Sequence, residues 1–343
     1  MNILFVHPNN DYTGSTKVLA DVIKEKYYND NCIALSLCFN DGFLSDIQQL
    51  EICKIFYPLI KGKSIPIFSS FISLIDRIAK FVKEAKQSDI IYINTIKPYY
   101  AAVIAQMMHK KIIWHIHEKY TTGSVTKIVY EYIQSHTDAH FIFVSKYVQN
   151  QYVISNNSTR EIRYNRLPED FTKTIEIRPL EKRKRTNLLV AAGLSKFKGV
   201  YNFVELARSL PDYNFHLVLS CSEEEKEGFV KSTRPPGNVK IWSRQNDMHP
   251  FYYEADVIMN MTIPSLCVET FGMTILEGMA YGLPAIVPNV GGPIELVHNG
   301  VEGYTIDVTD FKELSDAIVK ITSDKTTYEK FSVAALKRSQ DFS

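Results

Sequence analysis

Short apolar runs alternate with longer amphipathic stretches along the first half of the chain. Helical spacing of apolar residues predicts a helix after Thr16 and others at 68–86 and 98–108. The apolar runs predict buried strands at 3–6, 32–39, 89–95, 112–118 and 141–145. Continuously apolar strands separated by helices are typical of a parallel sheet that is covered on both faces. The first half therefore predicts an α/β domain.

The same pattern returns in the second half. It predicts strands at 187–193, 215–220, 239–242, 255–261 and 283–287, and helices at 311–321 and 327–339. Residues 169–186 are charged and lack periodicity, and we expect their basic run, 181–185, to be solvated. A chain of 343 residues exceeds what one core usually supports. We therefore predict domains at 1–168 and 187–325, a linker at 169–186 and a terminal helix at 326–343.

Composition and charge narrow the class of protein. Hydrophobic residues are 45% and charged residues 22% of the chain, which is ordinary for a globular protein in water. A net charge of +1 gives no bulk attraction to nucleic acid. Five cysteines lack metal-ligand spacing, and we find no leader and no apolar run of bilayer length. These features favour reduced thiols and a cytoplasmic location.

The stretch 68–86 has two interpretations. Its apolar stripe includes Phe71, Ile72, Ile75, Ile78 and Val82, whereas Arg77, Lys80, Lys83 and Lys86 lie toward the other side. A basic amphipathic helix can lie in a membrane surface, which would place the protein peripherally on the inner membrane face. The alternative, which we favour, is a helix that packs on the sheet and has a solvated outer side.

The strongest candidate chemistry lies between Val268 and Gly303. The predicted helix 274–281 follows Gly272, so the amides of Met273 and Thr274 are unpaired at its start. A helix start carries about half a positive charge, which suits a phosphate. Glu277, one turn inside, could accept hydrogen bonds from a diol, and Glu269, just outside, could face a group beyond the phosphate. An anion site flanked by two carboxylates fits a nucleotide diphosphate-sugar.

The continuation makes the pattern specific. An E-x7-E pair joins Glu269 to Glu277, with FG between them, and E-G-M-A-x-G-x-P-x-[IV] and a GG-x-x-E turn that ends at Glu295 follow. This arrangement resembles the donor site of family-four retaining glycosyltransferases, which have the GT-B fold. The resemblance implies two Rossmann-like domains facing across a cleft, with 1–168 as acceptor domain and 187–325 as donor domain. It also implies a hinge strand at 164–168 and a last helix that commonly returns to the first domain.

In that family, a sugar passes from a nucleotide diphosphate-sugar to a hydroxyl acceptor with retention of the anomeric configuration. The likeness implies a glycan or lipid-linked acceptor and a role in surface glycan assembly, such as capsule or lipopolysaccharide. No Asp-x-Asp occurs, so we expect no metal and no cofactor besides the nucleotide-sugar co-substrate. The implied catalytic residues are Glu269, His117 and Lys198. The implied donor-binding residues are Gly14, Lys196, Phe271, Gly272, Met273, Thr274 and Glu277.

Two assignments in the first domain keep alternatives. A family histidine at a strand exit contacts the donor sugar, and His117 matches it best, although some members place it one strand earlier, where this chain has Asn94. His117 could instead be a buried histidine bonded to backbone, or pair with Glu118 on a metal. Gly14 matches the glycine whose loop covers the donor phosphates, but a simple turn before a helix explains it equally well.

The second domain departs from the family at one position. The chain keeps Lys198 and Gly199 but has Leu194 where an arginine is expected, and Lys196 could substitute for that cation. A silent GT-B protein that binds a nucleotide-sugar or a partner subunit is therefore an alternative, as is a nucleotide-sugar epimerase. A dinucleotide oxidoreductase lacks support because there is no G-x-G-x-x-G. Acceptor contacts are expected from Asn10, Tyr12 and Tyr120 in the first-domain loops.

Overall fold

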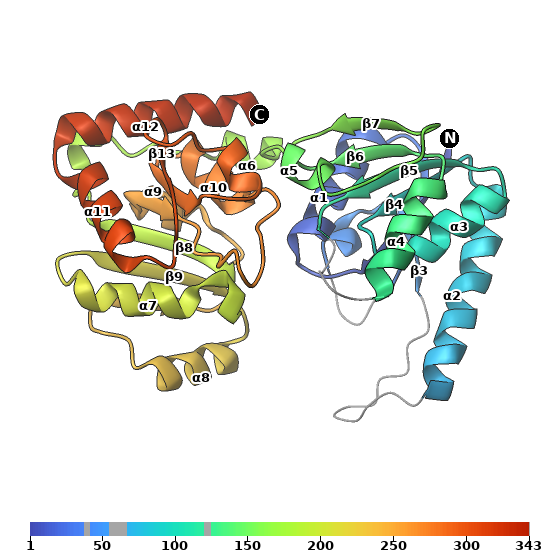
Figure 1. Ribbon diagram of the computed structural model, residues 1–343, viewed down its shortest axis with the longest axis horizontal. Coiled ribbons are helices and arrows are strands. Elements are labelled where there is room, and N and C mark those ends of the chain that lie inside the picture. Colours follow the sequence, from blue (N-terminus) through green and yellow to red (C-terminus); the bar gives the residue numbers. More distant parts are fainter. Residues whose placement is uncertain (38–41, 55–66, 120–124, 343) are drawn as a thin grey trace. The chain divides into compact units, whose positions relative to one another are not determined.

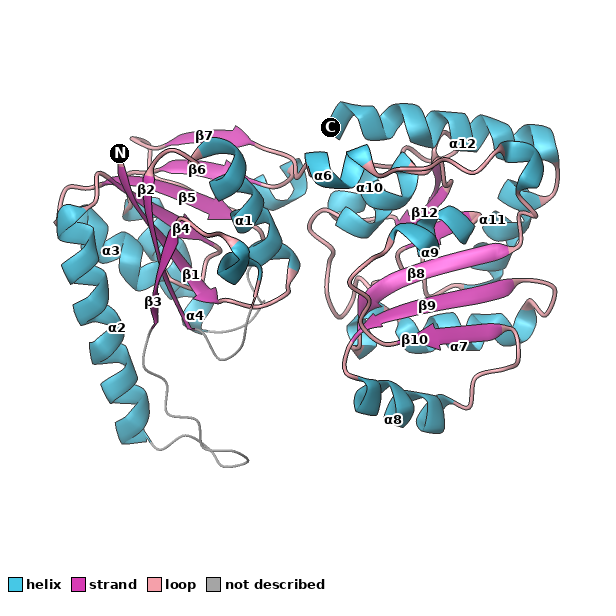
Figure 2. Cartoon of the chain, turned by 180° about the vertical axis from the view of Figure 1, so that it is seen from behind, coloured by secondary structure: helices cyan, strands magenta, loops and turns pink. Residues whose placement is uncertain are grey.

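A computed structural model of the chain describes residues 1–37, 42–54, 67–119 and 125–342. The chain forms two compact units, Met1–Arg163 and Tyr164–Ser343. Each unit is built on its own parallel sheet with helices on both faces (Figures 1 and 2). The alternation of apolar runs and amphipathic stretches therefore has the structural meaning that the sequence predicts.

The sheet of the first unit has the strand order β3-β2-β1-β4-β5-β6-β7. Its strands are β1 (Asn2–Asn9), β2 (Asn31–Leu37), β3 (Leu50–Lys54), β4 (Ile90–Asn94), β5 (Lys111–Ile116), β6 (His140–Phe143) and β7 (Thr159–Ile162). Phe5 of β1 lies opposite Ala34 of β2 on one side and Tyr92 of β4 on the other. Because all strands are parallel, the carboxyl ends of β1, β4 and β5 meet at one edge.

Helices cover both faces of this sheet. They are α1 (Gly14–Lys26), α2 (Ile67–Gln87), α3 (Tyr99–Met107), α4 (Val125–His136) and α5 (Lys146–Gln149), with a 3₁₀ turn η1 (Phe43–Asp46). Successive strand residues point to opposite faces. Trp114 and Ile116 therefore join a core with α2 and α3, whereas Ile113 joins the core beneath α1. His115 has the same parity as Ile113, so it lies on the α1 face.

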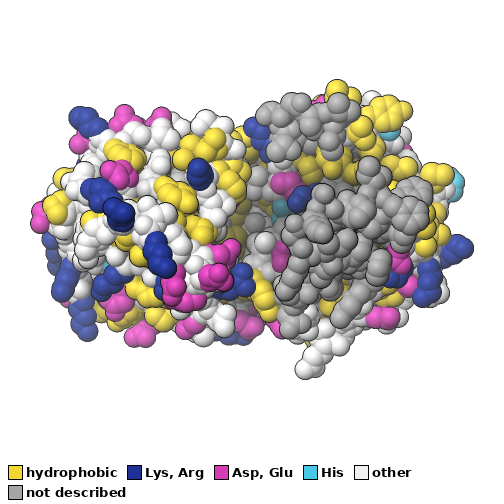
Figure 3. Space-filling view, turned by 90° about the horizontal axis from the view of Figure 1, so that it is seen from below, with side chains coloured by type: hydrophobic (Ala, Val, Ile, Leu, Met, Phe, Trp, Pro, Cys, Tyr) yellow, Lys and Arg dark blue, Asp and Glu magenta, His cyan; other side chains and the backbone are white. Residues whose placement is uncertain are grey.

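The second unit repeats this plan with the strand order β10-β9-β8-β11-β12-β13. Its strands are β8 (Asn187–Gly193), β9 (Asn214–Ser220), β10 (Val239–Trp242), β11 (Val257–Met259), β12 (Ala285–Pro288) and β13 (Gly303–Ile306). On the face that the unit presents in Figure 3, Lys and Arg side chains are interspersed with Asp and Glu. On that face, positive and negative side chains are therefore mixed and do not form a large patch of one sign, which agrees with the near-zero net charge.

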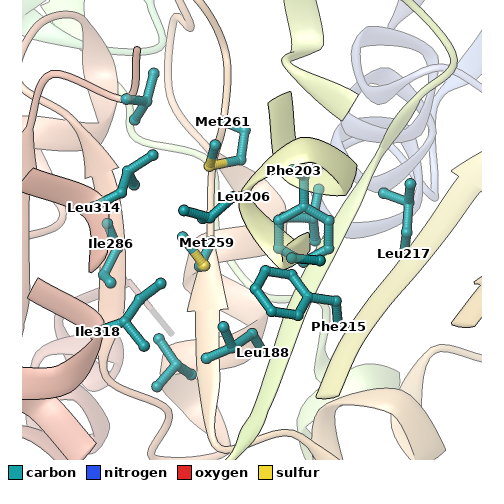
Figure 4. Packing of buried hydrophobic residues seen from close by; sticks show 14 of the residues in the cluster. Leu188, Phe203, Leu206, Phe215, Leu217, Met259, Met261, Ile286, Leu314 and Ile318 are labelled. Carbon is teal, nitrogen blue, oxygen red and sulfur yellow. The ribbon is translucent and has the colours of Figure 1, made fainter. Parts of the chain in front are cut away.

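Two cores hold the helices of the second unit. These helices are α7 (Val200–Ser209), α8 (Glu223–Thr233), α9 (His249–Glu254), α10 (Met273–Ala280), α11 (Phe311–Thr322) and α12 (Lys325–Ser339), with 3₁₀ turns η3 (Lys196–Lys198), η4 (Gly292–Glu295) and η5 (Gln340–Phe342). Leu188 packs with Phe203, Phe215 and Ile318 on one face (Figure 4). Leu189, its neighbour in β8, belongs to the opposite core with α9 and α10. Helix α12 packs against α10 and α11.

The segment 169–186, which the sequence predicts as a linker, is anchored to the second unit. It contains α6 (Glu169–Lys173) and a 3₁₀ turn η2 (Leu180–Lys182). The buried Arg178 donates to the backbone oxygen of Ala255 at 3.0 Å and pairs with Asp256. Arg183 is also buried and donates to backbone oxygens of Tyr281 and Gly282. The prediction that the basic run is solvated is therefore wrong for Arg183, because its guanidinium is buried and bonds backbone carbonyls and the Tyr328 hydroxyl.

Several elements differ from the sequence-based prediction. β3, β7, β13, α4 and α8 are additional, and residues 164–168 form no strand. β7 is an edge strand with the sequence TREI, so it has little apolar signal. Helix α8 begins at a capping box between Ser222 and Glu225, but its interior is mostly polar. Apolar patterns underestimate such elements because one side of each faces solvent.

None of the described helices combines the length and the apolar character that a bilayer crossing requires. The four cysteines in the described ranges, Cys32, Cys53, Cys221 and Cys267, form no disulfide with one another.

Candidate functional site

The donor loop, residues 268–273, turns the chain between β11 and helix α10. Gly272 caps the helix in the left-handed region, with φ 110°, which a side chain disfavours. Its carbonyl accepts the amides of Ile275 at 3.0 Å and Leu276 at 3.1 Å. The amides of Met273 and Thr274 donate no hydrogen bond to any residue in the described ranges. The start of α10 therefore keeps backbone donors for an anion.

The glycine turn before η4 supports this loop from the side. The Gly292 amide donates to the Glu269 carbonyl at 2.9 Å. A Cβ on Gly292 would meet the Thr270 carbonyl at 2.0 Å, and one on Gly291 would meet the Glu269 carbonyl at 2.4 Å. Both positions therefore require glycine because two backbone segments touch there. Glu295 at the end of the motif accepts a hydrogen bond from the Tyr164 hydroxyl at 2.8 Å.

The structure joins two predicted catalytic residues, Glu269 and Lys198. Lys198 Nζ lies 2.6 Å from Glu269 Oε2, and Asn260 Nδ2 lies 3.5 Å from the same oxygen. Burial disfavours the Glu269 carboxylate, but Lys198, Asn260 and the Thr270 amide together lower its pKa below the usual value. Gly199 permits this approach, since a Cβ there would meet the Met261 carbonyl at 1.9 Å. The pair provides an ionised carboxylate and a cation side by side.

Glu277 lies on α10 and is buried. The Tyr252 hydroxyl of α9 donates to its Oε2 at 2.5 Å. Burial, and then the Glu277 charge, raise the pKa of Tyr252 well above its usual value, so the hydroxyl keeps its proton. The tyrosine therefore orients the carboxylate that the sequence assigns to the diol.

The remaining second-unit candidates divide into exposed and buried groups. Lys196 is exposed, and its side chain makes no hydrogen bond or ion pair with the described residues. Leu194, which stands where the family has arginine, packs against the core of α7. The Phe271 side chain is 2% exposed and lies in the core with Tyr164 and Phe342. A donor contact from Phe271 would thus come from its backbone.

In the first unit, His117 belongs to a buried hydrogen-bonded chain. His117 Nε2 lies 2.8 Å from Asn94 Oδ1, and Asn94 Nδ2 lies 2.9 Å from His7 Nδ1. His7 Nε2 lies 3.0 Å from the Thr16 hydroxyl, which donates to Asp11 at 2.7 Å. Burial lowers the pKa of His7 to about 4 and that of His117 to about 3, so both rings are neutral at pH 7. The two positions that the family uses for its histidine, 94 and 117, are thus in contact.

The other first-unit candidates have different surroundings. A Cβ added to Gly14, the first residue of α1, would meet nothing within 4 Å, so the space in front of it is open. Asn10 is buried. Its side-chain nitrogen donates to the Ser45 hydroxyl, and its side-chain oxygen accepts from the backbone amide of Leu44, so Asn10 holds η1 in position. Tyr12 is 43% exposed and packs edge-on against Phe43. Tyr120 lies outside the described residues.

Sequence reasoning missed Tyr252, Asn260, His7 and Thr16 as partners of the candidate residues. Their contacts join segments that are distant in sequence or separated by a turn. A signal was available for His7, because it lies near the carboxyl end of the first predicted strand. In the described ranges, no three His, Cys, Asp or Glu side chains gather as metal ligands.

Comparisons with known proteins concern the sequence of the second unit and the fold of the whole chain. Residues 171–338 match the family model described as glycosyl transferases group 1. The sucrose synthase of Melioribacter roseus is 42% identical over 74 residues, which are 20% of this chain and 9% of that protein. The chain spans only about a tenth of the length of the curated relatives that it matches first.

Solved structures match over the whole chain. Anabaena HepE in complex with UDP-glucose has a TM-score of 0.78 and 20% identity, covering 100% of this chain and 95% of that one. WaaG, a glycosyltransferase involved in lipopolysaccharide biosynthesis, has a TM-score of 0.72 and 12% identity, covering 98% and 95%. At such identities, the likeness establishes the arrangement of elements within the fold.

Proposed function

We propose that this chain is a retaining enzyme that moves a sugar from a nucleotide diphosphate-sugar to a hydroxyl acceptor, because residues 171–338 match the family model of group 1 glycosyl transferases and the chain has the GT-B fold. The bond between the anomeric carbon and the diphosphate oxygen breaks, and a bond from that carbon to the acceptor oxygen forms on the same face. The acceptor's proton passes to the departing diphosphate, so no other reactant is needed. The setting we propose is surface glycan assembly, with the WaaG likeness in its support.

The observation that carries the proposal is the pair of unpartnered amides at the start of α10. The amides of Met273 and Thr274 would hold the diphosphate as its charge grows, and Lys198, which pairs with Glu269 of the same loop, would add a cation. One such preorganised donor contributes about 3–4 kcal/mol to transition-state stabilisation. Glu277 would hold the ribose, and Glu269 with His117 would orient the sugar.

The first donor to try is UDP-glucose. HepE, which shares the whole fold, was solved in complex with UDP-glucose. We propose that no metal takes part, because amides and lysines would balance the diphosphate charge. Chelation of divalent ions should therefore leave the rate unchanged.

A second candidate is a silent GT-B protein that binds the nucleotide-sugar without turnover. The observation in its favour is Leu194, which packs into the core where the family has an arginine. Lys196 is exposed and would have to supply the missing cation. An ammonium lacks the two-pronged geometry of a guanidinium, so stabilisation of the leaving group would be weaker.

A lipid-linked acceptor and peripheral membrane contact are supported by one surface of the first unit. We call it the α2–α4 surface, and it consists of the exposed apolar side chains Leu74, Ile75, Tyr99, Val103, Met107, Ile128, Val129 and Tyr132. Helix α3 packs against both α2 and α4, so the three helices that carry these side chains lie next to one another (Figure 1). Grouped apolar side chains on a surface are typical of contact with a membrane or protein.

The decisive measurement is hydrolysis of UDP-glucose in the absence of acceptor, with water taking the place of the hydroxyl. Glu269→Gln keeps the size but removes the charge that pairs with Lys198, so we expect the rate to fall about 100-fold. Glu227→Gln on the exposed side of α8 is the matched control and should behave as wild type.

The outcomes separate the candidates. Binding of UDP-glucose without hydrolysis or transfer supports the silent protein, and isomerised free donor would reveal an epimerase. Failure of the wild-type chain to bind any nucleotide diphosphate-sugar in a thermal-shift panel contradicts the proposal itself.

A further inference from the structure

His117 is hydrogen-bonded to further buried polar residues on the α1 face of the first sheet. β1, β4 and β5 are neighbours in the sheet, and Asn94, the last residue of β4, lies opposite His115 in β5. This register brings the side chains of His7, Asn94 and His117 together at the carboxyl edge. All three are at most 9% exposed. A buried polar chain of this kind is costly unless every member is paired, so its hydrogen positions are constrained.

One backbone carbonyl determines the orientation of the Asn94 amide. Asn94 Nδ2 lies 3.1 Å from the Ser15 carbonyl oxygen, which can only accept. The nitrogen of the amide therefore faces Ser15 and His7, and its oxygen faces His117. The flipped amide would bring two acceptors together at Ser15, so the geometry allows one assignment.

The proton positions of both rings follow from this orientation. Asn94 Oδ1 accepts, so His117 carries its hydrogen on Nε2. Asn94 Nδ2 donates, so His7 Nδ1 is bare and His7 carries its hydrogen on Nε2, directed at Thr16. The Thr16 hydroxyl donates onward to Asp11, whose charge ends the chain. Five side chains thus specify one hydrogen-bond direction from His117 to the loop before α1.

The other nitrogen of His117 is left available. Its Nδ1 has no hydrogen-bond partner among the described residues, and the residue is 9% exposed. In a neutral ring with a hydrogen on Nε2, Nδ1 is a hydrogen-bond acceptor. We propose that Asn94 is a positioning residue that holds His117 in its Nε2–H tautomer, so that Nδ1 accepts a hydrogen bond from a hydroxyl of the donor sugar. The sugar contact rests on the proposed function, whereas the tautomer does not.

The charged and titratable neighbours favour neutral rings. Burial is the largest cause of the low pKa of both His7 and His117. Asp11 raises and Lys97 lowers the pKa of His7, and His7 lowers the pKa of His117. The ring of His115, with its centroid 4.1 Å from that of His117, has a pKa well below the usual value through burial, His117 and Arg163. Glu118, the next residue, has a raised pKa through burial, which the Ile96 amide and Lys97 oppose. The ring of His117 therefore stays neutral near pH 7.

The test is a two-bond ¹H–¹⁵N correlation spectrum of the full chain labelled with ¹⁵N-histidine, which distinguishes Nδ1–H, Nε2–H and charged rings. Signals are assigned by single His→Gln variants. We expect the Nε2–H pattern for His7 and His117 from pH 7 down to about 5.5, which is below the ordinary pKa of a histidine side chain. An Nδ1–H or charged His117 at pH 7 would overturn the proposal without reference to activity.

Two variants test Asn94 itself. Asn94→Ala removes both hydrogen bonds, so we expect His117 to become a mixture of tautomers. Asn94→Asp keeps the shape but accepts from both rings, so His117 should keep its pattern, His7 should gain a hydrogen on Nδ1, and both ring pKa values should rise. Tyr92→Phe is the matched control, because it removes a buried hydrogen bond to His115 on the same sheet face. An unchanged His117 pattern in Asn94→Ala would contradict the assignment.

Binding separates this inference from the proposed function. Asn94→Ala should weaken UDP-glucose binding by about threefold to tenfold, the value of one neutral hydrogen bond, and leave UDP binding unchanged. An equal loss for UDP and UDP-glucose would show a general structural defect and contradict the positioning role. If the wild-type chain binds no UDP-glucose, the choice of this donor fails, while the spectra still decide the tautomer.

Discussion

At the scale of single residues, the donor side of the candidate site depends on side chains that hold other side chains. Glu277 is oriented by Tyr252, and Glu269 by Lys198 and Asn260. Hydrogen bonds to a charged acceptor are worth roughly 1.5–3 kcal/mol. A carboxylate that is already aligned loses less freedom when a ligand binds, so these supporting residues should affect affinity.

Tyr252→Phe should weaken binding of UDP and of UDP-glucose equally, by about threefold to tenfold, because only the orientation of Glu277 changes. Glu277→Ala should cost about tenfold or more. Titration calorimetry measures both. Tyr281→Phe is the control, since it removes the hydroxyl that bonds His249 in the same aromatic cluster. Unchanged affinities in Tyr252→Phe and Glu277→Ala would contradict the proposal that Glu277 binds the ribose.

The spacing of residues predicted Glu269 and Glu277, and the family resemblance predicted Lys198, but neither indicated Tyr252 or Asn260 as their partners. The E-x7-E pattern is local, because a turn and one helical turn separate its members. Tyr252 and His7 reach their partners across 25 and 87 positions, respectively. No single-sequence pattern records such contacts, so they become visible only in the folded chain.

At the scale of elements, the start of α10 is held in position by the glycine turn before η4. The two segments are in backbone contact, and any side chain at 292 would push on the Thr270 carbonyl. A displaced Thr270 would carry the following amides with it. The position of the turn thus controls the direction of the anion-binding amides.

Gly292→Ala should therefore destabilise the second unit by about 1–3 kcal/mol, the usual cost of overpacking. It should also weaken UDP binding, because the amides of Met273 and Thr274 move. Thermal denaturation with and without UDP reports both effects. Gly228→Ala in α8 serves for comparison, since its Cβ would meet nothing within 4 Å. If Gly292→Ala binds UDP with wild-type affinity, the turn does not determine the position of the donor-loop amides.

At the scale of the whole molecule, each of the two α/β units, which are both built on a parallel sheet, carries a different part of the proposed function. The second unit carries the family match at 171–338, and the candidate donor groups Glu269, Glu277 and Lys198. The first unit carries the histidine chain and the α2–α4 surface. The predicted fold class is confirmed, and residues 171–338 match the family model of group 1 glycosyl transferases, whereas the site residues stay predictions until ligands are tested.

The α2–α4 surface should bind lipid. We expect the full chain to sediment with phosphatidylglycerol-containing vesicles, and Met107→Ser with Ile128→Ser to reduce this about tenfold or more, because two exposed apolar side chains are lost. Val333→Ser, which removes an exposed apolar side chain of α12 in the second unit, should sediment as wild type. A wild-type chain that stays in the supernatant at every lipid composition contradicts membrane contact.

The amino-acid sequence by itself determined two α/β halves, the buried faces of their strands and the donor-loop motif. These properties are local, because apolar periodicity and short spacings act within one element or turn. Only the tertiary structure decided that Arg183 is buried, that Lys198 pairs with Glu269 and that Asn94 joins His7 to His117. Those outcomes depend on which side chains meet after the strands align, and the position of a proton on a histidine depends on its partner.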